Sequence, residues 1–293
     1  MKTIIKSRAV LSIILCMIFC AFSAGAGEKF PERIVSLGPA ITESLYLLKA
    51  QDRIIANTVY CLRPAEAANK EKIGTVLRAD VEKIVSLKPD MVLATSLSRP
   101  EQIQIMKGVG LKVVSFPQLQ TFEQLCRQFL ELGKITGKSK EAEKIIKSVK
   151  CRVKRIKKKT GAFVRPKVFV QIGAKPLFAA TGDSFINDFI ELAGGINIAS
   201  KVKTGFYSRE QVIKSNPDVI IIVTMGIAGE NEKKTWQKFK VLNAAKNNRI
   251  YVVDSYKMCS PTPEGFADTL EELVELFHPG HNKEERKKIK NEN

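Results

Sequence analysis

Short apolar runs alternate with amphipathic segments over most of the chain. Runs rich in Ile and Val, such as residues 33–38 and 90–94, have the length and composition of buried strands. Strands that alternate with helices of this length indicate a parallel α/β sheet. The predicted strands are 33–38, 52–57, 90–94, 111–115, 167–173, 218–223 and 249–254, and the predicted helices are 41–49, 80–88, 101–108, 121–137, 138–160, 183–193, 208–215 and 263–277.

One helix and strand pair occurs twice, 128 residues apart. The first copy covers residues 80–94 and the second covers 208–222, with their apolar positions in register. Glu82 matches Glu210, and a Pro-Asp pair begins seven residues later in each copy. An internal repeat of this size indicates two similar lobes, and a cleft between lobes is a common place for a small ligand.

The longest predicted helix, residues 138–160, is strongly basic. Twelve Lys or Arg residues occur between positions 134 and 159, beside Glu141 and Glu143. Apolar residues recur three and four apart in the same helix, so we interpret the charges as its solvated face. A helix of ~22 residues spans ~33 Å, which is enough to cross behind both lobes, and a helix absorbs little hinge motion. The apolar stripe consists of Ala142, Ile145, Val149, Val153 and Ile156.

The expected fold class is therefore α/β, with two similar parallel-sheet lobes joined by one long backbone helix and a ligand cleft between the lobes. We expect an N-terminal lobe at 27–137, the linking helix at 138–160 and a C-terminal lobe at 161–280. The charged tail at 281–293 has the composition of a disordered segment.

Residues 1–26 are typical of a secretory signal peptide. A positively charged start precedes an apolar run at 9–24, and small residues at 23–26 predict cleavage after Ala26. A retained membrane anchor is the alternative, but the run has 16 residues and a spanning helix needs ~20. Cleavage removes three positive charges and lowers the net charge from +18 to +15.

We expect the mature protein to be a free periplasmic monomer. A lipid anchor on Cys16 or Cys20 is less favoured, because Leu15 and Phe19 precede these cysteines in place of a small residue. Export from the cytoplasm also argues against a nucleic-acid partner, despite the basic composition.

Four cysteines remain after cleavage, and their state is open. In an oxidising compartment an even number permits disulfides, with three possible connectivities. Unpaired buried thiols are the alternative, and the spacing fits no metal-binding motif. The four are Cys61, Cys126, Cys151 and Cys259.

Five short segments carry a family resemblance: 33–43, 82–90, 168–173, 193–197 and 208–212. Together they resemble the substrate-binding proteins of ABC importers for ferric siderophores, haem and cobalamin. The resemblance covers residues 32–278 and is closest to the cobalamin-binding branch, which shares the VFxQxG, GGxN and SREQV phrases. It implies two α/β lobes joined by one long helix, a metal-chelate ligand, no cofactor of the protein's own and no catalytic residues.

The resemblance also implies a membrane partner. In the family, acidic residues that match Glu82 and Glu210 project from the two lobe tips and meet arginines of a dimeric permease. Both glutamates lie in the first turn of a predicted helix, where a negative charge also suits the helix dipole. That local electrostatic role is the alternative to docking.

Aromatic residues are the ligand contacts that the resemblance implies. Tyr60 and Phe178 match aromatic ligand contacts of the cobalamin branch, and Phe206 or Tyr207 lies where that branch carries a tryptophan. Tyr256 follows the last predicted strand. On predicted loops, these residues suit a flat macrocycle or a catecholate through stacking and apolar burial. Ordinary loop packing is the alternative.

The chain departs from the cobalamin branch in its charges. It lacks the cleft tryptophans and one arginine of that branch, and carries Arg63, Arg78 and Arg99 in their neighbourhood. Arginines in a cleft favour an acidic ligand, such as a carboxylate siderophore or the propionates of haem, and solvent exposure is the alternative. A haem would also need an axial ligand, for which Tyr60 or Tyr256 could serve.

The expected function is capture of a metal-chelate nutrient, cobalamin or a ferric siderophore, and its delivery to an ABC importer, with haem as an alternative ligand. A carrier of free zinc or manganese is disfavoured, because the only histidines are His278 and His281 near the tail. An exported α/β enzyme is disfavoured by the lack of a nucleophile motif, a phosphate loop or a metal-ligand pair. A signalling module that has kept the fold is a further alternative.

Overall fold

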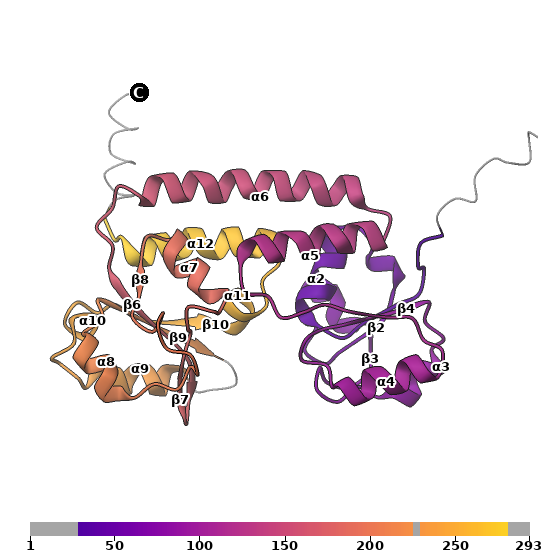
Figure 1. Ribbon diagram of the computed structural model, residues 1–293, viewed down its shortest axis with the longest axis horizontal. Helices are drawn as coiled ribbons and strands as arrows, with labels where there is room; N and C mark the ends of the chain where they lie inside the picture. The colour runs from indigo at the N-terminus through magenta and orange to yellow at the C-terminus, as the bar shows by residue number, and fades with distance from the viewer. Residues whose placement is uncertain (1–28, 225–228, 281–293) are drawn as a thin grey trace, which may run out of the picture. The chain divides into compact units, whose positions relative to one another are not determined.

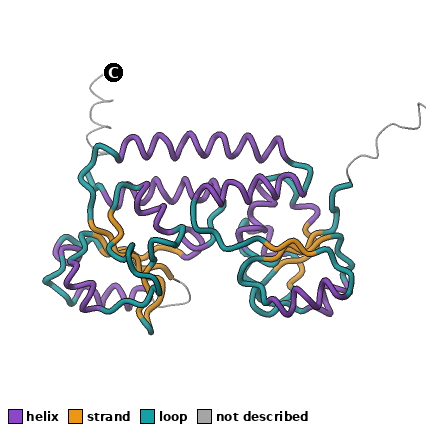
Figure 2. The backbone as a smooth tube through the Cα atoms, in the orientation of Figure 1, coloured by secondary structure: helices purple, strands orange, loops and turns teal. Residues whose placement is uncertain are grey.

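The computed structural model describes residues 29–224 and 229–280 (Figure 1). The predicted signal peptide and the predicted charged tail at 281–293 lie outside the described residues. Figure 2 shows two separate groups of strands, each flanked by helices. Within the described part of the chain, no helix combines the length and the apolar character needed to cross a membrane.

The N-terminal lobe is built on a sheet of five parallel strands in the order β3–β2–β1–β4–β5. Every residue of the central strands β1 and β4 is buried, as expected for a parallel sheet covered on both faces. The elements are β1 (Ile34–Ser36), α2 (Pro39–Leu47), η1 (Gln51–Arg53), β2 (Ile54–Asn57), η2 (Ala65–Asn69), β3 (Glu71–Lys72), α3 (Val81–Ser86), β4 (Met91–Ala94), α4 (Pro100–Gly108), β5 (Val113–Ser115) and α5 (Phe122–Ile135).

The C-terminal lobe follows α6 (Ser139–Thr160) and has the strand order β10–β9–β6–β7, with β8 also paired to β6. The elements are β6 (Lys167–Ala174), β7 (Leu177–Ala179), α7 (Ile186–Leu192), β8 (Ile196–Asn197), α8 (Arg209–Ser215), β9 (Val219–Thr224), α9 (Gly229–Gln237), α10 (Asn243–Lys246), β10 (Ile250–Asp254), α11 (Ser255–Cys259) and α12 (Pro263–Phe277).

The prediction of two α/β lobes with mainly parallel sheets is confirmed, with one exception. Strand β7 pairs with β6 in the antiparallel sense. Only Lys175 and Pro176 separate the two strands, and so short a connection permits a hairpin but no parallel crossover. The sequence pattern did not predict β7, because three residues carry no readable periodicity.

The two copies of the repeat begin their helices with the same type of cap. The side chain of Asp80 accepts a hydrogen bond from the amide of Lys83 at 3.0 Å, before α3. The side chain of Ser208 accepts one from the amide of Gln211 at 3.2 Å, before α8, and the side-chain oxygen of Gln211 accepts one from the amide of Ser208 at 2.8 Å. These caps satisfy helix-terminal N–H groups. They fix the first turns in which Glu82 and Glu210 lie.

A continuous apolar core joins the two lobes. Helix α6 packs against α5 of the N-terminal lobe and against α7 and α12 of the C-terminal lobe (Figure 1). Phe266 of α12 lies between Phe122 of α5 and Phe189 of α7, with ring centroids 4.7 and 4.0 Å away. Asp188 of α7 accepts a hydrogen bond from the amide of Phe122 at 2.6 Å. The connection between the lobes is therefore a packed layer, which we call the shared core, and not one helix alone.

A second core in the C-terminal lobe contains Trp236, the only tryptophan of the chain. Its indole N–H donates to Gln171 of β6 at 2.7 Å, and the guanidinium of Arg209 lies 4.7 Å from its ring centre. Arg209 forms a 2.7 Å ion pair with Glu232, which also accepts from Gln171. This network ties α8 and α9 to the sheet.

The sequence patterns predict neither helix α9 nor several strands of two or three residues. Helix α9 buries only Gly229 and Trp236, so its sequence has no apolar stripe that could reveal it. Helix α11 lies where a loop was expected, and it is one short turn capped by Asp254. Strands β3 and β8 have two residues each. Elements this short depend on tertiary contacts more than on local sequence.

The four cysteines named above are free thiols in the structure. Cys61 and Cys126 are buried, Cys259 is partly buried and Cys151 is exposed. Burial raises the pKa of the Cys126 thiol to about 12 and that of Cys259 to about 11. Since the thiolate is the reactive form, these two side chains act as packing groups.

We expect Phe266→Ala to destabilise both lobes together. Phe266 is fully buried between the two other rings of the shared core, and removal of a buried Phe side chain costs about 3–5 kcal/mol. Urea unfolding followed by far-UV circular dichroism should give a lower midpoint in a single transition. Val164→Ala is the control, because Val164 is 90% exposed and should change stability by less than about 0.5 kcal/mol. Separate transitions for the lobes would contradict the shared core.

Candidate functional site

The carboxyl ends of the N-terminal strands open onto a cavity shared by both lobes. This inter-lobe cavity has a volume of about 200 Å³. Its N-terminal wall comes from the segments after β1, β4 and β5, and its C-terminal wall comes from Phe185 and residues 259–261. Ligands of open α/β sheets bind at this edge of the strands. The cavity is therefore the part of the fold best suited to hold a small molecule.

Tyr60, Arg63 and Tyr256 meet between the lobes and form a cluster that bridges them. The hydroxyl of Tyr256 donates a hydrogen bond to the backbone carbonyl of Tyr60 at 2.5 Å. The guanidinium of Arg63 lies 4.6 Å from the ring centre of Tyr256 and 3.8 Å from the carboxylate of Glu43. We call these three residues the Tyr60 cluster. The structure thus brings three of the predicted ligand-contact residues together, and their role in binding stays a prediction.

Burial shifts the pKa of two groups at this place, Tyr256 and the neighbouring Glu43. It raises the pKa of the Tyr256 hydroxyl, so this group stays a hydrogen-bond donor at neutral pH. It also raises the pKa of Glu43, and the charge of Arg63 partly offsets that rise. The Nε atom of Arg63 is buried without a hydrogen-bond partner among the described residues. Part of the hydrogen-bond donor capacity of this guanidinium therefore remains unused.

A second cavity of about 250 Å³ adjoins the Tyr60 cluster. Arg63, Tyr256 and Lys257 line it, together with the start of α12. Pro261 lines both cavities, so the two lie next to each other between the lobes.

A family model for periplasmic binding proteins matches residues 34–257. The chain belongs to the periplasmic binding protein family. It is 31% identical over 268 residues to an uncharacterized ABC transporter substrate-binding lipoprotein, YvrC, of Bacillus subtilis, covering 88% of this chain and 83% of the relative. It is 27% identical to a vitamin B12-binding protein of Photorhabdus laumondii, covering 74% and 80% of the two chains.

The fold agrees with solved structures of the same type. A periplasmic heme binding protein from Pseudomonas aeruginosa matches with a TM-score of 0.78 at 21% identity, over 86% of this chain and 94% of that one. The predicted family is thus confirmed, and with it the solute-binding role. The relatives named here are binding proteins and not enzymes.

The remaining predicted aromatic residues of this binding protein do not join the Tyr60 cluster. Phe178 lies in β7 and packs edge-on against Phe206 at 4.9 Å between ring centres. Gly205, with φ of +73°, leaves room for the Phe178 ring, which a side chain at that position would strike. Phe206 is 58% exposed, so this pair offers an apolar surface of its own. Tyr207 packs on the buried Phe169 at 5.5 Å, which assigns it to the core of the C-terminal lobe.

Two placements from the sequence are therefore wrong. Phe178 and Tyr256 were expected on loops, but Phe178 belongs to a strand and Tyr256 to helix α11. Strand β7 depends on its pairing with β6, and helix α11 depends on the Asp254 cap. No local apolar pattern reveals either of these contacts.

Arg78 and Arg99 are exposed, and each lies close in sequence to a residue that lines the inter-lobe cavity. Arg78 is two residues after Val76, and Arg99 is two residues after Leu97, and both Val76 and Leu97 line the cavity. Neither guanidinium takes part in an ion pair within the part of the chain that the structure describes.

Sequence reasoning missed most of the residues that line the inter-lobe cavity. Leu97 is 61% exposed, Phe116 and Phe185 add aromatic surface, and the buried Gln128 carbonyl oxygen has no hydrogen-bond partner among the described residues. The available signal was position, because Leu97 and Phe116 come within three residues of the ends of predicted strands, and such positions face the ligand in open sheets.

Glu82 and Glu210 are both exposed, in the first turns of α3 and α8. Hydrogen bonds from its own amide and from the Ser208 hydroxyl lower the pKa of Glu210. Figure 1 shows α3 and α8 in different lobes, on the side of the protein away from α6. Neither residue lines the cavities described above.

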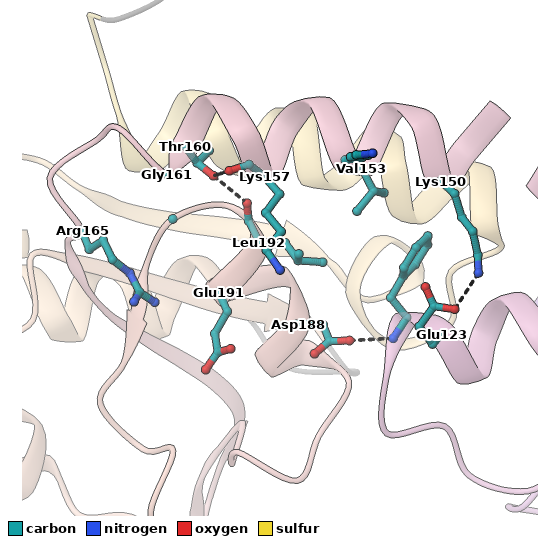
Figure 3. Close-up of a pocket in the computed structure, with 13 residues that line it drawn as sticks. Glu123, Lys150, Val153, Lys157, Thr160, Gly161, Arg165, Asp188, Glu191 and Leu192 are labelled. Atoms are coloured by element: carbon teal, nitrogen blue, oxygen red, sulfur yellow. Dashed lines mark hydrogen bonds and ion pairs between the residues drawn. The ribbon is translucent and has the colours of Figure 1, made fainter. Parts of the chain in front are cut away.

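A cavity of about 700 Å³ lies elsewhere, between α6 and α7 beside the start of α5 (Figure 3). Its walls carry Lys154, Lys157 and Arg165 as well as Asp188 and Glu191. Burial raises the pKa of Asp188, and the hydrogen bond from the Phe122 amide opposes that rise. None of the lining residues follows the carboxyl end of a strand, so we do not assign the solute site to this cavity despite its volume.

No group of three or more potential metal ligands occurs within the described residues. His278 is buried and hydrogen-bonds to the carbonyl of Ala193 at 2.9 Å, while His281 lies outside the described residues.

We expect Tyr256→Phe to loosen the contact between the lobes without unfolding the protein. The change removes one hydrogen bond, worth about 0.5–1.5 kcal/mol, and leaves the shared core intact. Amide hydrogen exchange should become faster in the segment around Tyr60, as measured by mass spectrometry of its peptides. Tyr251→Phe is the matched control, since Tyr251 lies in the preceding strand β10 and has no such bond across the lobes. Equal exchange in both variants would mean that the hydroxyl does not hold the lobes together.

Proposed function

We propose that this chain is an extracytoplasmic solute-binding protein of an ABC importer. It captures a metal-chelate nutrient between its lobes and delivers the ligand to a membrane permease. The observation that carries this proposal is the convergence of Tyr60, Arg63 and Tyr256 from two lobes. Arg63 and Tyr256 line a cavity that shares Pro261 with the cavity at the strand ends. The family match and the names of the relatives support the transport role.

Cobalamin or a ferric siderophore is the first candidate ligand. The inter-lobe cavity and its neighbour measure about 200 and 250 Å³, whereas ligand pockets for larger molecules reach about 1,000 Å³. A macrocyclic chelate would therefore span both cavities across Pro261 and displace the contact between Tyr256 and Tyr60. Tyrosine faces and Leu97 would supply apolar burial, and Arg63 would pair with an acidic group.

Haem is the second candidate, because the same cluster combines a tyrosine hydroxyl with an arginine. Tyrosine can serve as an axial ligand of haem iron, and arginine suits a propionate. To bind the iron of haem, the Tyr256 hydroxyl would have to give up its hydrogen bond to the carbonyl of Tyr60.

Calorimetric titration of the purified protein with cyanocobalamin, haemin and a panel of ferric siderophores tests the proposal. We expect saturable binding of one of them with a Kd of about 1 μM or tighter, equivalent to about −8 kcal/mol. Arg63→Gln should weaken an acidic ligand at least ~10-fold, or about 1.4 kcal/mol. Arg127→Gln is the matched control, because Arg127 is exposed on α5 away from both cavities.

Absence of binding to every compound in the panel would contradict the proposal and favour an exported enzyme or a signalling module. Equal loss of affinity in both arginine variants would remove Arg63 from the ligand site.

Docking to the permease is assigned to Glu82 and Glu210. Each is an exposed carboxylate on a separately capped helix, one in each lobe, so the pair matches a partner with two similar halves. The capped first turns hold both charges in fixed positions, which favours ion pairs with a cationic surface.

We expect Glu82→Ala combined with Glu210→Ala to leave ligand affinity unchanged and to reduce transport. Uptake of labelled ligand into permease proteoliposomes measures the second quantity, and calorimetry measures the first. Glu101→Ala with Glu230→Ala is the control pair, because these exposed residues also lie in first helical turns, one in each lobe. Full uptake with the Glu82 and Glu210 variant would rule out the docking role.

A further inference from the structure

The positive charge of this protein is concentrated on one helix. Helix α6 contains ten Lys or Arg residues and two Glu, a net charge of +8 in 22 residues. The whole chain without the predicted signal peptide carries +15. More than half of the excess charge therefore lies on an element that makes up less than a tenth of the chain.

Five of these lysines form one straight row on the outer face of α6. Their spacing alternates between four and three residues, with Cys151 at the middle of the row, and every position in it is exposed. This spacing places side chains along one line of an α-helix. The row spans about 27 Å, with a residue every ~5 Å along the helix axis. We call it the lysine ridge: Lys140, Lys144, Lys147, Cys151, Lys154 and Lys158.

The charges of the ridge are not neutralised by the protein itself. Within the described residues, no ion pair engages the five lysines, whereas Lys150 and Arg152 on the flanks pair with acidic residues of α5 and α12. Glu143 is the one exposed acidic residue on α6 near the ridge. Lys154 of the ridge also lines the adjoining 700 Å³ cavity, where Lys150, Lys157 and Arg165 share the walls with Glu123, Asp188 and Glu191. An anion is therefore attracted to the ridge more strongly than to the cavity.

The shape of the ridge favours a chain-like partner over a membrane surface. Helices that lie in a membrane interface bury an apolar face in the lipid, but the apolar face of α6 is already buried in the shared core. Helix α6, which carries the ridge, also lies on the side of the protein away from α3 and α8 (Figure 1). If Glu82 and Glu210 dock to a permease, as proposed above, the ridge points away from that membrane.

We propose that the lysine ridge binds a linear polyanion of the extracytoplasmic space, a polymer with phosphate groups at regular intervals along an extended chain. A row of lysines attracts such a polymer by displacing its condensed counterions, without reading any particular sequence. Bound in this way, the protein would be held among envelope polymers while its docking face stays free. The statement that the docking face stays free rests on the proposed function, whereas binding of the polyanion does not.

Binding to long-chain inorganic polyphosphate tests the inference. We expect the affinity of the purified protein to fall linearly on a log–log plot as salt rises from ~50 to ~200 mM. The combined variant Lys144→Gln, Lys147→Gln, Lys154→Gln and Lys158→Gln should weaken binding at least ~10-fold and reduce the slope by about 3, since each phosphate contact contributes ~0.7. Polyphosphate should also slow maleimide labelling of Cys151, located by mass spectrometry, because that thiol lies within the ridge.

The matched control replaces four exposed lysines outside α6, at positions 107, 112, 240 and 246, with Gln. It removes the same charge, but charges farther than ~8 Å from the polymer are screened at physiological salt, so the affinity should change by less than ~2-fold. Equal loss in both variants would overturn the inference, as would unchanged Cys151 labelling or tighter binding to vesicles of phosphatidylglycerol than to polyphosphate.

The polyphosphate experiment and the chelate titration can fail independently of each other. Calorimetry with the chelate panel on the ridge variant should give the wild-type Kd. Loss of polyphosphate binding with intact chelate binding concerns the ridge alone, and polyphosphate binding without any chelate binding would contradict only the solute-binding proposal.

Discussion

The apolar layer that both lobes share is the constraint on which the rest of the molecule depends. Phe122, Phe189 and Phe266 come from three helices and two lobes, yet they form one stack beneath α6. To separate the lobes by a wide rotation, the protein would have to expose this buried surface to water, at about 25 cal/mol for each Å². The cleft is therefore largely formed before a ligand arrives, and only the side chains at its mouth are free to adjust.

Because the cleft is nearly fixed, we expect the loops at the strand ends to determine which ligand binds. The Tyr60 cluster joins one such loop to α11 of the opposite lobe through a hydrogen bond and a ring-guanidinium contact. These contacts are weak compared with the shared core, so a ligand can replace them without disturbing the fold. The carboxylates of Glu82 and Glu210, which we propose for docking, stand on capped helices that line neither of these cavities.

Much of the fold could be predicted from the sequence, because apolar periodicity and capping residues act locally. The repeat around Glu82 and Glu210, the long basic helix and the central strands all follow from such signals. The antiparallel strand at Phe178 could not be predicted, since its pairing depends on a turn and on contacts with β6. The core position of Tyr207 and the cavity wall at Phe185 likewise arise from packing between segments far apart in sequence.

The single tryptophan gives the molecule an uneven optical response. Trp236 is buried in the C-terminal lobe, with Gln171 at its N–H and Arg209 over its ring. Its emission therefore responds to the polarity of that lobe and has no counterpart in the N-terminal lobe. Because Arg209 is the neighbour of Glu210 on α8, a pull on that helix would move a charge across the indole and alter its spectrum. The helix that carries Glu210 thus lies beside a tryptophan fluorophore, while the helix that carries Glu82 has no tryptophan in its lobe.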